Sequence, residues 1–192
     1  MIGAPISAAN GVDPNQPQTL LDVPQPAVMV KVLDKWAQQR KAARVMLVID
    51  VSGSMGDPAS DAGDLPTKLD LAKEAARSAL DEFKADDQVG LRIFSTGLGG
   101  DGKTNFIDLV PIGPISQQRE QLAARIDDLS PVQGTPLYDV TATSYADMVK
   151  DYDPKLINAI VLLTDGRNDD GNDNDDDNQL RTLVQSLRAN SE

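Results

Sequence analysis

The apolar positions of this chain form two kinds of pattern, unbroken runs and spaced stripes. The run at 44–50 (RVMLVID) ends in an acidic residue and predicts a strand buried on both faces, as in a parallel sheet. Strands are also predicted at 87–95, 105–111 and 156–164, of which the last is the most hydrophobic. Because proline tends to end strands or to lie at sheet edges, Pro111 places the strand at 105–111 at an edge.

Apolar side chains at helical spacing predict helices before, between and after these strands, at 27–40, 68–83, 116–128, 135–150 and 179–189. Strands that alternate with helices imply parallel pairing through right-handed crossovers. The predicted fold class is therefore α/β, a doubly wound, mostly parallel open sheet flanked by helices. Ligands of such sheets bind beyond the carboxyl ends of the strands.

Four residues mark the expected helix starts. Thr67 predicts an N-cap, because Asp70 follows three residues later and completes a capping pattern. Pro136 is expected in the first position of its helix, where its missing N–H costs nothing. Asn178 is expected to cap the last helix.

The N-terminal region differs in composition from the rest of the chain. Residues 1–25 are rich in Pro, Asn, Gln and Gly and predict a linker. We expect residues 1–40, the linker with a short helix, to be the tail of a preceding region, and residues 41–192 to form the domain. No apolar run approaches the roughly 20 residues that cross a bilayer, and the first residues lack the features of a signal peptide.

The charge of the chain is strongly negative and unevenly distributed. A formal net charge of −12 argues against nucleic acid or an anionic membrane as a partner. Residues 165–177 contain seven Asp and one Arg, a net of −6 and so half of the total. The favoured interpretation is a solvated acidic loop. The alternative is a second cation site, for Ca2+, although the loop lacks the glycine and closing glutamate of an EF-hand.

Hydroxyl and carboxylate side chains gather where predicted strands and helices begin or end. Asp50, Ser52 and Ser54 follow the first buried strand, Thr135 opens a helix, and Asp165 follows the most hydrophobic strand. These hard oxygen ligands suit Mg2+ or Mn2+. The chain has no Cys and no His, which excludes thiolate ligands, disulfides, imidazole chemistry and Ser-His-Asp triads.

Three segments around these residues resemble the metal-ion-dependent adhesion site of von Willebrand factor A domains. They are VIDVSGSM at 48–55, GTP at 134–136 and LTDG at 163–166, and the resemblance extends over about residues 44–190. Each segment alone is a common turn or cap. The presence of all three segments in this order, each at the end of a predicted strand or helix, makes the resemblance to this site specific.

The resemblance implies a site for one divalent cation, Mg2+ in the first place and Mn2+ or Ca2+ as alternatives. Ser52, Ser54 and Thr135 would contact the ion directly, and Asp50 and Asp165 would act mainly through bound waters. A remaining position would accept an Asp or Glu of a protein partner. The implied function is a metal-dependent interaction module of the adhesion type rather than an enzyme.

A finer resemblance concerns the ends of the chain. TLLDVPQP at 19–26 resembles the junction that precedes bacterial A domains after a periplasmic-type solute-binding region. It implies a parent protein at the cell envelope or outside the cell, with a cytoplasmic location as the alternative. The family's sheet continues after the helix expected at 179–189, so we expect later elements to be missing. The strand at 156–164 would then lack a neighbour and leave an uncovered edge.

Two other functions are compatible with part of the pattern. Asp50 after a buried strand would suit a metal-assisted phosphohydrolase, as nucleophile or base. Such a site usually needs a second nearby Asp and a Lys, whereas the first Lys after Asp50 is Lys68, and no Walker-type phosphate loop is present. A structural domain without a ligand is the third possibility.

Overall fold

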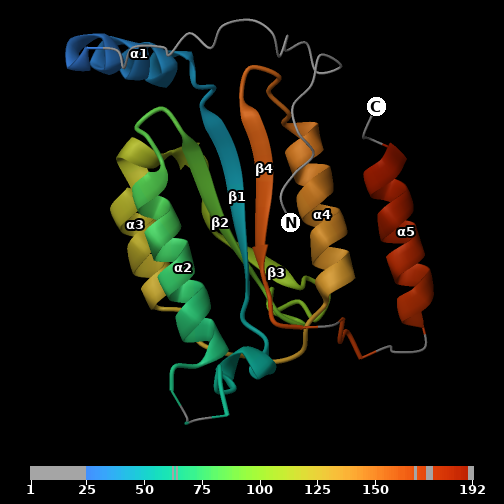
Figure 1. Ribbon diagram of the computed structural model, residues 1–192. Coiled ribbons are helices and arrows are strands. Elements are labelled where there is room, and N and C mark those ends of the chain that lie inside the picture. Colours follow the sequence, from blue (N-terminus) through green and yellow to red (C-terminus); the bar gives the residue numbers. More distant parts are fainter. Residues whose placement is uncertain (1–24, 62, 64, 167, 172–174, 190–192) are drawn as a thin grey trace, which may run out of the picture. The chain divides into compact units, whose positions relative to one another are not determined.

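The computed structural model describes residues 25–61, 63, 65–166, 168–171 and 175–189 (Figure 1). It divides into one unit that ends at Arg40 and a second that begins at Lys41. The predicted linker and nearly all of the segment at 19–26 lie outside the described residues.

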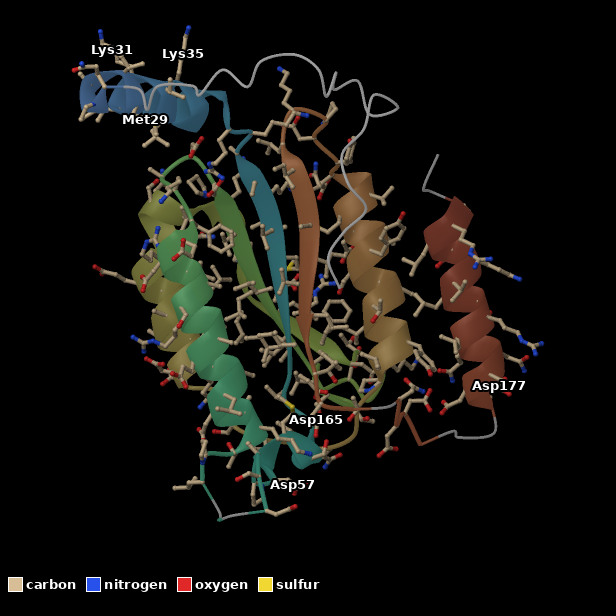
Figure 2. The ribbon with its side chains drawn as sticks, viewed as in Figure 1. Met29, Lys31, Lys35, Asp57, Asp165 and Asp177 are labelled. Atoms are coloured by element: carbon tan, nitrogen blue, oxygen red, sulfur yellow. The ribbon has the colours of Figure 1, made fainter. Side chains whose placement is uncertain are left out.

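The first unit is described by one helix, α1 (Pro26–Gln39), which confirms the helix predicted at 27–40. Met29 points away from Lys31 and Lys35 on this helix (Figure 2), so its surface is amphipathic. No helix among the described residues has the length and apolar character needed to span a membrane.

The described residues of the second unit contain a four-stranded sheet in the order β3-β2-β1-β4. The strands are β1 (Ala43–Asp50), β2 (Gln88–Phe94), β3 (Phe106–Pro114) and β4 (Ile157–Leu163). β1 pairs in parallel with β2 and β4, whereas β3 pairs antiparallel with β2. The predicted class, a mostly parallel open α/β sheet, is confirmed, as is the edge position of the strand at 105–111. β3 is antiparallel because no crossover helix separates it from β2.

Helices cover both faces of this sheet (Figure 1). α2 (Lys68–Glu82) and α3 (Ile115–Asp127) pack on one face, and α4 (Leu137–Lys150) packs on the other. α5 (Asp176–Ala189) packs against α4. Each of these four helices buries apolar side chains, among them Leu80, Ile126, Val140 and Leu183.

The central strand β1 belongs to two apolar cores, one on each face of the sheet. Val45, Leu47 and Ile49 face α2 and α3, whereas Met46 and Val48 face α4. None of these five side chains is more than 5% exposed. Burial on both faces explains the continuous apolar run and holds the carboxyl end of β1 in a fixed position.

The helix starts agree with the sequence predictions in one case and differ in two. Thr67 and Asp70 form the expected reciprocal capping box at the start of α2. Pro136 occupies the N-cap position of α4, one residue before the position predicted for it. α5 begins at Asp176, so Asn178 is not its cap. Acidic residues in the first turn favour this earlier start, because they interact well with the positive end of the helix dipole.

β4 forms the second edge of the sheet. It pairs with β1, and no further strand lies beside it among the described residues. Ile157 and Val161 are 52% and 40% exposed, so this strand is less covered than its hydrophobic sequence indicates. The expectation that later elements of the sheet are missing stays a prediction.

Candidate metal centre

The residues proposed as a cation site lie at the carboxyl ends of β1 and β4. The chain runs from β1 outward to β2 and β3 and then crosses to β4 on the other side of β1. The ends of β1 and β4 therefore meet at the point where the strand order reverses, the usual ligand position in such sheets. Asp50 ends β1, and Asp165 follows β4 closely.

Asp50 is completely buried and is held by neutral groups. Its Oδ1 accepts a hydrogen bond from the Ser52 amide at 2.8 Å, and its Oδ2 accepts one from the Thr164 hydroxyl at 2.6 Å. No Lys or Arg among the described residues contacts it. Burial raises the pKa of Asp50 above its ordinary value, and the negative charge of Asp165 adds to this increase.

The two serines and Asp165 form a chain of close oxygen atoms. The Ser52 and Ser54 hydroxyl oxygens lie 3.2 Å apart, and Ser54 donates to Asp165 Oδ1 at 3.1 Å. Ser54 belongs to the 3-10 helix η2 (Gly53–Gly56), whose tight turn brings its hydroxyl back towards the end of β1. Four of the five predicted residues are thus linked through hydrogen bonds.

Thr135, the fifth predicted residue, is fixed by its backbone. Its N–H donates to the Asp169 carbonyl, and its carbonyl accepts from the Asp169 N–H, both at 2.7 Å. The residue is 4% exposed, and its side chain packs beside Gly166 in the loop after β4. Its hydroxyl makes no side-chain hydrogen bond to another residue in the described ranges and is available as a ligand.

Backbone contacts join the loop after β1 to the loop before α4. Gly53 N donates to the Gln133 carbonyl at 2.6 Å, and Val132 N donates to the Val51 carbonyl at 2.7 Å. Ser95, at the end of β2, accepts from Gln133 N at 3.0 Å and donates to the Gly134 carbonyl at 3.1 Å. Ser95 is fully buried. These contacts hold the serine loop and the threonine loop at one position relative to each other.

Sequence reasoning did not identify Lys68 as part of the site. Its Nζ lies 2.5 Å from Asp165 Oδ2 and 3.8 Å from Asp57 Oδ2. The hydrogen bond to Asp165 raises the pKa of Lys68. Lys68 is 97 residues away from Asp165 in the chain, so no local pattern could predict this contact. Thr164 and Ser95 were missed as well, although Thr164 directly precedes Asp165.

The acidic loop is organised around Asn168, which is 4% exposed. Asn168 Oδ1 accepts from the Tyr138 amide at the start of α4, and Asn168 Nδ2 donates to Asp176 Oδ1 at 2.7 Å. Gln179 donates to Asp170, and Asn178 donates to Asp175. These carboxylates accept amide hydrogen bonds at the start of α5. Within the described ranges no group of three His, Cys, Asp or Glu residues could hold a metal ion. Residues 172–174 of the proposed second cation site lie outside those ranges.

The donor set fits a hard divalent cation. Ser52, Ser54, Asp50 and Asp165 are linked at the carboxyl ends of β1 and β4, and Thr135 lies beside Gly166 in the loop after β4. An all-oxygen set of three hydroxyls and two carboxylates suits Mg2+ and similar ions. A buried carboxylate without a cationic partner is costly in free energy, and a second carboxylate nearby increases that cost. A divalent cation beside Asp50 and Asp165 would offset both effects.

Comparison with known proteins places the chain among von Willebrand factor type A domains. The family model of this domain matches residues 45–168. A von Willebrand factor type A protein from Catenulispora acidiphila has a similar solved structure, with 22% identity and a TM-score of 0.57. The match covers 76% of this chain and 30% of that chain. No curated protein matches the sequence significantly.

Two further solved structures share the fold. The pilus adhesin SpaC from Lactobacillus rhamnosus GG, in its open conformation, is 26% identical with a TM-score of 0.52, and the match covers 68% of this chain and 15% of that chain. The domain named vWF in the type V pili tip protein Mfa5 from Porphyromonas gingivalis is 18% identical with a TM-score of 0.50. Here the match covers 66% of this chain and 38% of that chain. The chain thus spans less than half the length of each of these three structures.

Gly134→Ala is expected to displace the threonine loop and destabilise the fold. A Cβ at Gly134 would lie 2.6 Å from Thr96 Oγ1 and 2.7 Å from the Asp169 carbonyl oxygen, which is too close for real atoms. We expect the free energy of unfolding in urea to fall by about 1–3 kcal/mol, the usual cost of overpacking. Gly63→Ala is the control, because its Cβ would meet nothing within 4 Å. Equal stability of the two variants would contradict the close packing of this loop.

Asp50→Asn is expected to stabilise the protein at neutral pH in the presence of EDTA. Because the folded pKa of Asp50 lies above its ordinary 3.8, the folded chain binds more protons than the unfolded chain between the two values. The contribution of Asp50 to stability is therefore lost as pH rises through this interval, and the neutral amide avoids that loss.

Urea denaturation in EDTA at neutral and at acid pH checks this expectation. The advantage of Asp50→Asn should shrink towards acid pH, where Asp50 itself becomes neutral. The exposed Asp61→Asn serves as the matched control for the loss of one charge. A variant less stable than the wild type at neutral pH would contradict the burial cost assigned to Asp50.

Proposed function

The chain belongs to the family of von Willebrand factor type A domains, and we propose that it is a protein-interaction module of the adhesion type whose partner binds through a divalent cation. The observation that carries this proposal is the buried Asp50 carboxylate, which has no cationic partner among the described residues and lies near Asp165. A site with this charge and with three hydroxyls suits a cation better than it suits an anionic substrate.

In this proposal Ser52, Ser54 and Thr135 hold the ion, Mg2+ in the first place, with Mn2+ or Ca2+ as alternatives. Asp50 and Asp165 orient water molecules and supply negative charge. When bound, the ion would offer one exchangeable position to an Asp or Glu carboxylate of the partner. The neutral hydroxyls favour such a contact, because they leave much of the positive charge of the ion uncompensated.

The solved structures that share the fold support the choice of an adhesion module. SpaC is a pilus adhesin, and Mfa5 is a pili tip protein. By analogy we propose a role at the cell envelope or outside the cell, as part of a larger protein. The segment at 19–26 extends the proposal to a parent in which a solute-binding region precedes this domain.

A phosphohydrolase is the second candidate function, and one observation favours it. The sequence places no lysine soon after Asp50. In the folded chain, however, Lys68 Nζ lies 2.5 Å from Asp165, where it could balance the charge of a phosphate. The other objection stands, because the sequence contains no Walker-type phosphate loop. We therefore place the interaction module first.

Mg2+ titration tests the ion site. Calorimetry on the wild type should show one binding event, and Mg2+ at 100 times its Kd should raise the free energy of unfolding by about 2.7 kcal/mol. Ser52→Ala should weaken binding at least about tenfold, because it removes a direct ligand. Ser60→Ala, an exposed serine of the same loop, is the control and should leave binding unchanged.

A pull-down with Mg2+ and with EDTA tests the adhesion mechanism. Capture of a partner should require Mg2+, fail with Ser52→Ala and persist with Ser60→Ala. Replacing the contacting Asp or Glu of the captured partner by its amide should abolish binding. Capture that neither EDTA nor Ser52→Ala affects would overturn the metal-dependent mechanism.

Hydrolysis of p-nitrophenyl phosphate separates the two candidate functions. The interaction module predicts no Mg2+-dependent turnover above buffer. Turnover by the wild type that disappears in Asp50→Asn and persists in Asp61→Asn would favour the phosphohydrolase instead.

A further inference from the structure

Lys68 is placed between two carboxylates at the edge of the candidate metal centre. Its Nζ lies 2.5 Å from Asp165 Oδ2 and 3.8 Å from Asp57 Oδ2. Figure 2 shows Asp57 and Asp165 near each other at the carboxyl end of the sheet. The Lys68 side chain is 34% exposed, so it has room to move, whereas the Asp165 side chain is only 13% exposed.

Both oxygens of Asp165 are in use in this arrangement. Oδ1 accepts from the Ser54 hydroxyl, and Oδ2 accepts from Lys68. Lys68 therefore provides the positive charge that this end of the sheet would otherwise receive from an ion. An ammonium group at this distance from Asp165 repels any divalent cation that binds beside the same carboxylate.

The backbone around Lys68 is fixed, so only its side chain can respond. Thr67 and Asp70 close the capping box at the start of α2, and Lys68 N donates to the Asp57 carbonyl at 3.0 Å. This last bond keeps Asp57 next to Lys68 wherever the ammonium group points. The Asp57 side chain is 66% exposed and can receive the ammonium group at the solvent side.

We propose that Lys68 is a built-in competitor of the divalent cation: it neutralises Asp165 in the ion-free protein and moves to Asp57 when the ion binds. This inference rests on the proposed ion site. It assigns Lys68 the role of lowering the affinity of the site for Mg2+, and Asp57 the role of limiting that effect.

Mg2+ calorimetry on the full chain, compared between variants, tests the competition. Lys68→Met should tighten Mg2+ binding about tenfold, the change produced by loss of one moderate charge interaction. Lys73→Met, one to two turns along the same helix, controls for the change in net charge and should bind Mg2+ much as the wild type does. Asp57→Asn should weaken binding more than its control Asp61→Asn, because the displaced ammonium group then lacks its second partner.

Thermal unfolding in EDTA provides an independent measurement. Lys68→Met should lower the Tm in EDTA, because Asp165 then faces Asp50 without compensation, and saturating Mg2+ should remove most of this difference. The Asp57→Asn comparison remains decisive if Lys68→Met fails to fold in EDTA, since Asp57 is an exposed surface residue.

The outcomes separate this inference from the proposed function. Mg2+ binding of equal strength in the wild type and in Lys68→Met overturns the competition and leaves the ion site intact. Weaker binding in Lys68→Met also overturns it, since Lys68 would then support the ion. Absence of Mg2+ binding in the wild type overturns both proposals.

Discussion

The buried carboxylate of Asp50 is the feature on which the rest of the site depends. It ends a strand that lies between two apolar cores, so the side chain is removed from water together with the strand. Among the described residues only an amide and two hydroxyl groups compensate it, and the charge of Asp165 adds to the cost of its ionisation. A fold that keeps such an arrangement gains from a bound cation, because a buried carboxylate without one is destabilising. In the proposed site, stability and ion binding would therefore be coupled through this one residue.

The scaffold explains why the hydroxyl groups stay in place around that carboxylate. The loops after β1, before α4 and after β4 are joined by backbone hydrogen bonds, several of them at 2.6–2.7 Å. Buried Ser95 holds the loop before α4, and buried Asn168 joins the loop after β4 to the starts of α4 and α5. Side chains held through their backbones keep their geometry without a ligand, which would reduce the entropy cost of binding an ion in the proposed site.

The sequence could predict the elements with strong local patterns and the residues at their ends. The run at 44–50 identified β1 and hence the position of Asp50, and Thr67 with Asp70 identified the start of α2. Contacts between distant segments had no local signal. The distance of Lys68 from Asp50 along the chain was an argument against a phosphohydrolase, although folding brings Lys68 next to Asp165. The start of α5 was misplaced because Asn178 is a common cap, whereas Asp176 and Asp177 extend the helix by dipole interactions.

The most direct test of this account is the position of Mn2+ in crystals of the protein, located by its anomalous scattering. The account predicts one strong peak within coordination distance of the Ser52, Ser54 and Thr135 hydroxyls, at about 2.0–2.2 Å for a small hard cation. It also predicts that the Lys68 ammonium group lies beside Asp57 in these crystals. The account would be contradicted by crystals in which Mn2+ occupies only the acidic segment at 166–178, or in which the hydroxyls bind no ion at saturating concentration.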